Sequence, residues 1–116
     1  MTLVRLKPSV NNYTGMLEFN HRGAWGSICD DYWDLRDAIV ACRQLGFKGA
    51  LQALKYGTGG QGSANQPIWL DDVYCHGNET DIRNCQHSSY GVHNCDHSED
   101  AGVICASGTG MSDLIK

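Results

Sequence analysis

The sequence has little proline, few charged residues and no long hydrophobic run. It holds 2 prolines in 116 residues, and charged residues make up 19% of it, below the roughly 25% of an average globular chain. No apolar stretch is long enough to cross a membrane, and Met1 is followed by no apolar run of signal-peptide length. We therefore expect no direct insertion of this chain into a membrane.

Basic patches and catalytic motifs are also missing. The net charge is −4 and the nine lysines and arginines are scattered, which argues against nucleic acid as a partner. The chain contains neither GxSxG nor HExxH, its serines have no recognisable histidine and aspartate context, and nothing marks a pair of acids as a glycosidase site. The sequence therefore predicts that this chain is not an enzyme.

Cysteine and glycine are plentiful by contrast. There are 14 glycines, and hydrophobic residues make up 41% of the chain, which is typical of one turn-rich domain with a modest core. The six cysteines are even in number and widely spread, which favours three disulfides, an oxidising compartment and a piece of a larger secreted or membrane-anchored protein. Two alternatives stay open, buried free thiols or a zinc site. Zinc is disfavoured because no CxxC pair is present, although four histidines lie near cysteines, namely His76, His87, His93 and His97.

Periodicity predicts one helix and several short strands. Apolar residues at helical spacing indicate a helix over residues 35–45, with Asp34 and Asp37 as N-terminal caps and Gly46 at the end. Residues 79–85 are expected to form one or two further helical turns. The predicted strands cover residues 3–7, 16–20, 25–29, 50–55, 68–75 and 102–105, the second and third forming a hairpin.

The loop and the tryptophans have expected roles as well. The glycine-rich stretch 57–67 is predicted to be flexible and too rich in glycine to pack, and it runs into a strand rather than a helix, unlike a phosphate-binding loop. Three aromatic side chains in and beside the expected strands are predicted to be core or interface anchors, namely Trp25, Trp33 and Trp69.

Acidic residues gather beside two distant cysteines. Asp30 and Asp31 follow Cys29, and Glu99 and Asp100 come shortly before Cys105. A disulfide framework can pull such segments into one cluster, in which carboxylates repel one another unless a hard cation lies between them. The pattern therefore indicates a small extracellular module that holds calcium and uses it to bind a partner.

Several segments together resemble the scavenger receptor cysteine-rich family over nearly the whole chain. They are residues 26–33, 37–38, 40–46, 61–63, 68–73 with Cys75, 77–79 and 97–103. The resemblance implies a small disulfide-stapled α+β domain over residues 1–106, in which a curved antiparallel sheet cradles one main helix. Residues 107–116 are expected to be a linker or tail. With six cysteines the chain is similar to the subgroup with the bridges Cys29–Cys95, Cys42–Cys105 and Cys75–Cys85.

The resemblance also implies cation sites. Asp30, Asp31 and Glu99 are assigned to a first site, and Asp71 with Asn94, and with Asp31 or Asp72, to a second. Oxygen ligands of this kind suit Ca²⁺, or Mg²⁺, rather than zinc. The alternative is that the two aspartates cap turns and that Glu99 pairs with an arginine. Close by, His93 and His97 flank the first site and would make cation binding sensitive to pH.

The expected function is that of a non-catalytic extracellular module of a scavenger-type receptor or secreted protein, which binds protein or polyanionic ligands with the help of calcium. The alternative is an accessory interaction domain of a secreted oxidase or protease whose catalytic domain lies outside this chain. Either way, a larger multidomain or oligomeric protein is expected. Asn12 and Asn78 lie in glycosylation sequons.

Overall fold

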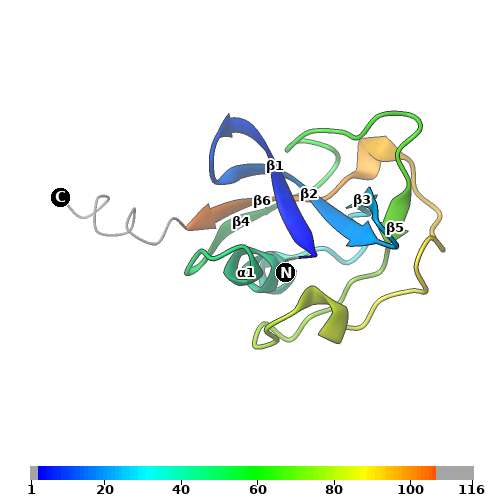
Figure 1. Ribbon diagram of the computed structural model, residues 1–116. Coiled ribbons are helices and arrows are strands. Elements are labelled where there is room, and N and C mark those ends of the chain that lie inside the picture. Colours follow the sequence, from blue (N-terminus) through cyan, green and yellow to red (C-terminus); the bar gives the residue numbers. More distant parts are fainter. Residues whose placement is uncertain (1–2, 107–116) are drawn as a thin grey trace.

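The computed structural model describes residues 3–106, which form one curled sheet, one α-helix and two short 3₁₀ helices (Figure 1). The predicted tail, residues 107–116, lies outside the described residues. In chain order the elements are β1 (Val4–Asn11), β2 (Thr14–His21), β3 (Ala24–Ile28), α1 (Leu35–Gln44), β4 (Gly49–Leu54), β5 (Ile68–Leu70), η1 (Ile82–Asn84), η2 (His97–Glu99) and β6 (Gly102–Ala106).

The sheet has the order β4-β6-β2-β3-β5, and β1 pairs with β2 outside this path. All neighbouring strands are antiparallel except β3 and β5, which run parallel. The prediction of an antiparallel sheet therefore needs one correction. Between β3 and β5 the chain passes through α1 and β4, and such a long crossover allows a parallel return that no hairpin permits.

Helix α1 forms because its first turn is capped by its own side chains. The Asp34 carboxylate accepts the N–H groups of Arg36 and Asp37, and the Asp37 carboxylate accepts the N–H of Asp34, which completes a capping box. The helix ends at Gln44 with Leu45 as its C-cap, and Gly46 follows with φ +101°, the left-handed conformation that glycine adopts readily. The predicted helix and its caps are confirmed.

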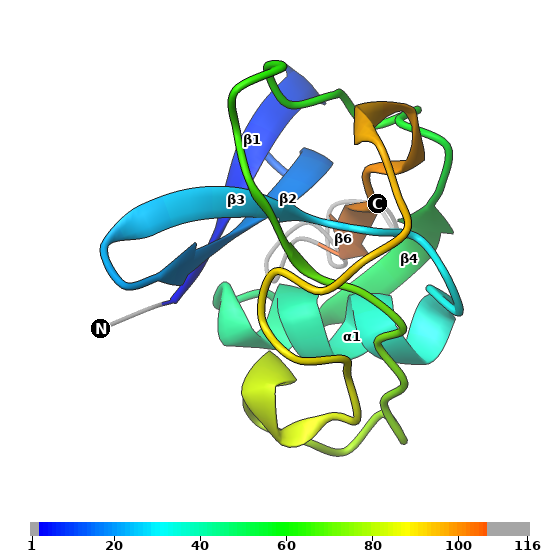
Figure 2. The same ribbon diagram turned by 90° about the vertical axis from the view of Figure 1, so that its right-hand side faces the viewer.

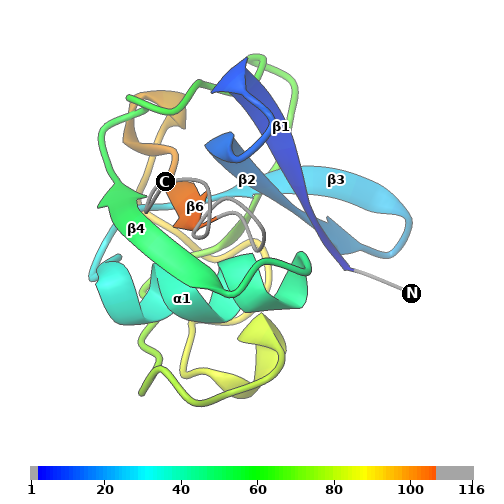
Figure 3. The ribbon, with the colours of Figure 1, turned by 90° about the vertical axis from the view of Figure 1, so that its left-hand side faces the viewer.

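The helix lies under the sheet, with β4 running along it (Figures 2 and 3). Its buried face meets one continuous core that includes the fully buried side chains of Phe19, Ile28 and Leu70. Three disulfides fasten this arrangement, and their pairing is the one that the family resemblance implies: Cys29–Cys95, Cys42–Cys105 and Cys75–Cys85. Cys42 joins the helix directly to β6.

The three tryptophans differ in their surroundings. Trp33 is 2% exposed and its Nε1–H donates to the Gly102 carbonyl at 3.0 Å, so it is a core anchor. Trp69 is half-buried against the core and donates to the Ala24 carbonyl at 2.9 Å. Trp25 is also half-buried but lies outside the core, with the Arg5 guanidinium 4.1 Å from its ring centroid.

Asp37 gives the stability of the domain a dependence on pH. Burial raises the pKa of this carboxyl group from 3.8 to about 7, against the opposing effect of the Asp34 and Cys75 N–H groups that donate to it. Because the pKa is higher in the folded chain, its contribution to stability is present below pH 3.8 and is lost as the pH rises to about 7. Relative to an Asp37→Asn variant, the parent should lose free energy of unfolding across this window in urea titrations. A difference that does not change with pH would contradict the assignment.

Two expected segments need correction, and a third is confirmed. The strand predicted over residues 68–75 is confined to β5, whereas the one or two helical turns predicted over residues 79–85 are present as the single 3₁₀ turn η1. The glycine-rich stretch 57–67 does pack, because Gly59 is buried against the backbone of Gly15, and the Gly62 N–H donates to Asp100 Oδ2 at 2.7 Å. The absence of a Cβ is what permits these close approaches.

Gly15 in β2 leaves no room for a side chain and provides a test of the sheet packing. A Cβ at this position would lie 2.0 Å from the Lys7 carbonyl oxygen. Because a backbone atom cannot move aside cheaply, Gly15→Ala should lower the free energy of unfolding by about 3 kcal/mol or more, measured by urea unfolding. Gly49→Ala is the matched control, since a Cβ there meets nothing within 4 Å. Equal effects of the two substitutions would contradict this packing.

Candidate metal centre

Three chain segments meet where the acidic residues gather. The end of β3 bonds to the end of β5 through the Cys29 N–H and the Leu70 carbonyl, 2.8 Å apart. On its other side, the Asp30 N–H donates to the Glu99 carbonyl at 2.9 Å. The Cys29–Cys95 disulfide then ties the segment that precedes η2 to the same point. Backbone bonds and one disulfide therefore fix the relative positions of the acids, independently of any cation.

The first predicted set of residues is brought together. One carboxylate oxygen from each of Asp30, Asp31 and Glu99 lies within 4.8 Å of the others, beside the Cys29 sulfur. We call these three residues the first acid cluster. Asp30 is 3% exposed, whereas Asp31 and Glu99 are half-buried. A cation between them would have a buried floor and a side open to solvent.

The second predicted set is brought together in part. Carboxylate oxygens of Asp31 and Asp71 lie within 4.8 Å of each other, next to the Cys29–Cys95 sulfurs. Asp71 is 3% exposed, and the Asn94 backbone N–H bonds to it, which places Asn94 beside the pair. Asp72 is exposed and stands outside this group. Asp31 therefore belongs to both groups of acids.

Some of these acids also have structural roles, as the alternative interpretation predicts. Asp30 Oδ2 accepts the Tyr56 N–H at 2.7 Å, and Glu99 Oε1 accepts the Asp96 N–H at 3.2 Å to close a capping box on η2. The predicted ion pair of Glu99 with an arginine is not formed. Within residues 3–106, the ion pairs are Arg5–Glu18, Arg36–Asp34, Arg83–Asp81 and His97–Asp100. No lysine or arginine of this part of the chain neutralises either acid group.

The electrostatics of Asp71 reflect this lack of a counter-ion. Burial raises the pKa of its carboxyl group, and the negative charges of Asp31 and Asp72 raise it further, while N–H groups of Asp72 and Asn94 oppose the shift. A divalent cation placed between Asp31 and Asp71 would remove the repulsion that these charges create. The donor set consists of carboxylate oxygens, since the nearby sulfurs are held in a disulfide. Hard cations such as Ca²⁺ and Mg²⁺ prefer such donors.

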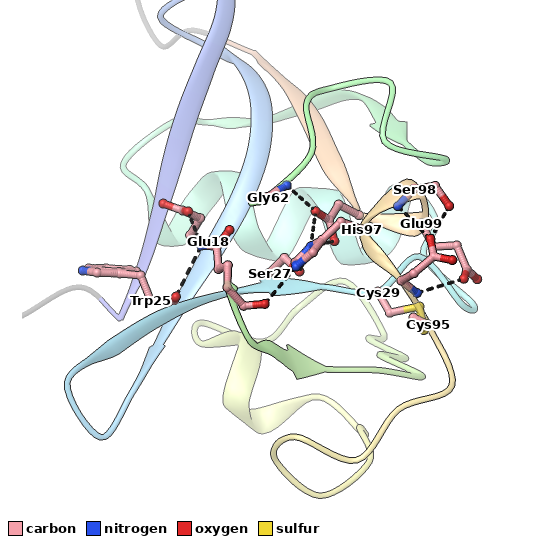
Figure 4. A network of polar contacts seen from close by, with 12 residues as sticks. Glu18, Trp25, Ser27, Cys29, Gly62, Cys95, His97, Ser98 and Glu99 are labelled. Carbon is pink, nitrogen blue, oxygen red and sulfur yellow. Dashed lines mark hydrogen bonds and ion pairs between the residues drawn. A yellow bond between two sulfur atoms is a disulfide. The ribbon is translucent and has the colours of Figure 1, made fainter. Parts of the chain in front are cut away.

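A partly buried polar network lies near the acids and was not predicted from the sequence (Figure 4). His97 Nδ1 lies 2.8 Å from Asp100 Oδ2 and 3.4 Å from Ser27 Oγ, while its Nε2 lies 2.8 Å from the Gln66 carbonyl. In a nucleophilic triad the serine and the aspartate contact opposite ring nitrogens. Here both contact Nδ1, and Ser27 is fully buried. The network therefore fixes η2 to the glycine-rich stretch and has no triad geometry.

The remaining candidate residues lie apart from the acids or at their edge. His93 is exposed, and its Nδ1 accepts the Cys95 N–H at 3.0 Å, so it lies beside the disulfide. Asn12 is exposed in the turn between β1 and β2, and Asn78 is exposed between Cys75 and η1. Their glycosylation and any pH effect of His93 or His97 stay predictions.

Comparison with known proteins gives the family. The model of the scavenger receptor cysteine-rich domain, SRCR, matches residues 8–106. The chain belongs to the SRCR family. Its sequence is 47% identical over 104 residues to the mouse protein "Macrophage scavenger receptor types I and II". The aligned segment covers 90% of this chain and 22% of that protein. The chain therefore spans about a fifth of the length of that receptor.

Solved SRCR structures share the fold. The dimeric form of the SRCR domain of mouse MARCO is 44% identical with a TM-score of 0.74, over 88% of this chain and 93% of that one. The third SRCR domain of murine neurotrypsin is 46% identical with a TM-score of 0.78, over 88% and 94%. The N-terminal extracellular domain of the lymphocyte receptor CD5 is 20% identical with a TM-score of 0.52, over 90% and 91%, and shares the fold alone.

Membership of this family identifies the chain as an extracellular domain. Three disulfides agree with that compartment. Within residues 3–106, no helix is long and apolar enough to cross a bilayer. SRCR domains of scavenger receptors are in general ligand-binding modules without catalytic activity of their own.

Proposed function

We propose that this SRCR domain binds Ca²⁺ at its acid groups and uses the bound ion to hold an anionic group of an extracellular ligand. The observation that carries the proposal is the position of Asp31, which belongs to the first acid cluster and also lies within 4.8 Å of Asp71, with no basic side chain of residues 3–106 paired to either group. Asp30, Asp31 and Glu99 would hold one ion. Asp31 and Asp71, beside Asn94, would hold a second.

The burial of the acids supports a role for the ion in ligand binding. Ca²⁺ takes about six to eight oxygen ligands, more than the three carboxylates of the first acid cluster supply unless every one is bidentate and unshared. Asp30 and Asp71 are nearly buried, while Asp31 and Glu99 reach the surface. The remaining coordination positions would thus face outward, where water or an oxygen of the ligand can occupy them.

The basic residues support the same mechanism for anionic ligands. Arg5, Arg36 and Arg83 are each paired with a carboxylate, and Arg43 donates to backbone carbonyls. These four of the nine basic side chains are already engaged within the domain, and the others are scattered along the sequence. A domain with a net charge of −4 would therefore attract a polyanion through the bound cation rather than through a basic patch.

Glu99 offers a matched pair of variants for a binding experiment. Glu99→Gln keeps an acceptor for the Asp96 N–H, because glutamine also completes a capping box, but it removes one charge from the first acid cluster. The control is Asp96→Asn, which keeps an N-cap and removes an exposed charge outside the clusters.

We expect immobilised dextran sulfate to capture the parent in calcium and release it in EDTA. Glu99→Gln should weaken capture about tenfold, in keeping with the loss of one charge-assisted contact, and Asp96→Asn should leave it unchanged. Capture that persists in EDTA would contradict the role of calcium. Equal weakening by both variants would contradict the assignment of Glu99.

A second candidate function is that of an interaction domain within a larger extracellular enzyme. The similarity to the third SRCR domain of neurotrypsin, 46% over 88% of the chain, favours it as strongly as the similarity to the macrophage receptor favours the first. The neurotrypsin domain is the third SRCR domain of its protein, and the MARCO domain has a dimeric form. Both facts support a place for this domain in a larger or oligomeric protein. The domains that flank this one in the full-length protein decide between the two.

A further inference from the structure

An open pocket of about 360 Å³ lies beside the second acid group. It is lined by Tyr32, Asp72, Tyr74 and Gln86. Two of these residues directly follow the clustered acids, since Tyr32 follows Asp31 and Asp72 follows Asp71. The charge of Asp72 also acts on the carboxyl group of Asp71. The pocket is therefore a neighbour of the proposed cation site and shares its two chain segments.

The backbone at the pocket is strained. Tyr32 has φ +63° and Asp72 has φ +54°, in a left-handed region that aspartate tolerates but that costs a residue such as tyrosine about 1–2 kcal/mol. For Tyr32 no burial of the ring offsets this cost, because the residue is 70% exposed. Strain of this kind concentrates at binding sites, where it aims a side chain in the direction that function requires.

The other two lining residues of the pocket are held together by backbone hydrogen bonds. Tyr74 and Gln86 form an isolated β-bridge, with N–H to carbonyl distances of 2.8 and 3.2 Å. The Arg36 guanidinium lies 5.2 Å from the centroid of the Tyr74 ring and is itself paired with Asp34. The Tyr74 ring therefore already contacts one cation, whose charge is balanced by its own carboxylate.

The charges of the pocket favour a cationic group. The Asp72 carboxylate pairs with no lysine, arginine or histidine of residues 3–106. With one Ca²⁺ balancing Asp31 and Asp71, the charge of Asp72 still remains. Two tyrosine rings beside one unpaired carboxylate are the chemistry that recognises quaternary ammonium groups, because such a group is attracted by ring faces and needs no hydrogen-bond acceptors.

We propose that this pocket binds the quaternary ammonium group of a phosphocholine ligand, whose phosphate coordinates the Ca²⁺ ion held beside Asp31 and Asp71. The inference rests on the proposed calcium site. The two-carbon link of phosphocholine joins an anionic to a cationic group, which matches a cation site and a pocket built on the same two chain segments. Free phosphocholine and a phosphatidylcholine headgroup present the same chemistry.

The test is calorimetric titration of the oxidised domain with phosphocholine, inorganic phosphate, choline and phosphoethanolamine in about 5 mM calcium. Phosphocholine should bind about tenfold more tightly than phosphate or phosphoethanolamine, since ring contacts with a cation supply a factor of this size. Tyr32→Ala should remove that advantage and leave calcium affinity unchanged, whereas Tyr32→Phe should keep it. Tyr56→Ala is the control, because Tyr56 is 71% exposed, has φ +58° and contacts Asp30 only through its backbone.

The possible failures are distinguishable. If the parent binds calcium but holds phosphocholine no more tightly than phosphate or phosphoethanolamine, the pocket assignment is wrong and the calcium site stands. If the parent binds no calcium, the proposed function fails, and titration with choline alone then tests the pocket assignment by itself. Choline binding that Tyr32→Ala abolishes would support the pocket, and its absence would overturn it. Co-sedimentation with phosphatidylcholine vesicles distinguishes a lipid surface from the free headgroup as the source.

Discussion

Removal of the Cys29–Cys95 disulfide is expected to lower the free energy of unfolding by about 4 kcal/mol, because the bond closes a long loop of the unfolded chain. The two residues are separated by 66 positions. Calcium affinity should fall with it, since Asp31 Oδ2 lies 3.7 Å from Cys95 Sγ and the bond holds the segment leading to Glu99 against β3. Urea unfolding and calcium titration of the Cys29→Ala, Cys95→Ala double variant measure both effects.

The Cys75–Cys85 bond provides the comparison. It spans 10 positions, so its removal should cost less, about 2.7 kcal/mol in the same loop-entropy model. The bond lies outside both acid groups that contain Asp31, and calcium affinity should stay close to that of the parent. If the Cys29–Cys95 variant bound calcium as the parent does, the disulfide would not organise the site.

Asp31→Asn should have opposite effects on stability with and without calcium. Without the ion, the variant should be more stable than the parent, because the charge of Asp31 raises the pKa of Asp71 and repulsion between them is relieved. With calcium at ten to a hundred times its dissociation constant, the parent gains roughly 1.4 to 2.7 kcal/mol that the variant lacks. Thermal unfolding of both proteins in EDTA and in calcium measures this reversal of order.

Asp34→Asn is the control for this experiment. Asp34 lies outside the acid groups, and asparagine is an equally good N-cap. Its stability should respond to calcium as that of the parent does. If Asp31→Asn were less stable than the parent in EDTA as well, Asp31 would have a structural role. The proposed destabilising repulsion between Asp31 and Asp71 would then be contradicted.

Local features of the sequence were sufficient to predict the helix and most of the strands. Asp34 and Asp37 cap α1 within four residues of each other, and apolar spacing marks its buried face, so both signals are readable without distant contacts. The β2–β3 hairpin follows from its glycine-bearing turn in the same way. The disulfide pairing is different, because six cysteines permit fifteen arrangements and only the resemblance to the SRCR family selected one.

Asp30 and Asp31 drew attention because they follow Cys29, and the resemblance to the SRCR family added Glu99, Asp71 and Asn94, whereas the groups behind these acids were not predicted. Ser27, Gln66 and His97 come from three distant segments, and nothing in their local sequence indicates that they meet. The packing of Gly59 against Gly15 likewise depends on the sheet being assembled first. The left-handed conformation of Tyr32 is set by its place between Asp31 and the core residue Trp33, since tyrosine has no such preference of its own.

The central claim is that the acid groups around Asp31 bind calcium, and calorimetric titration of the oxidised, EDTA-treated domain tests it most directly. We predict saturable binding with a dissociation constant of about 10⁻⁴ to 10⁻³ M, as in other extracellular calcium modules, which Asp31→Asn abolishes and Asp96→Asn leaves intact. Absence of binding at about 10 mM calcium, or equal binding by the parent and Asp31→Asn, would contradict the claim.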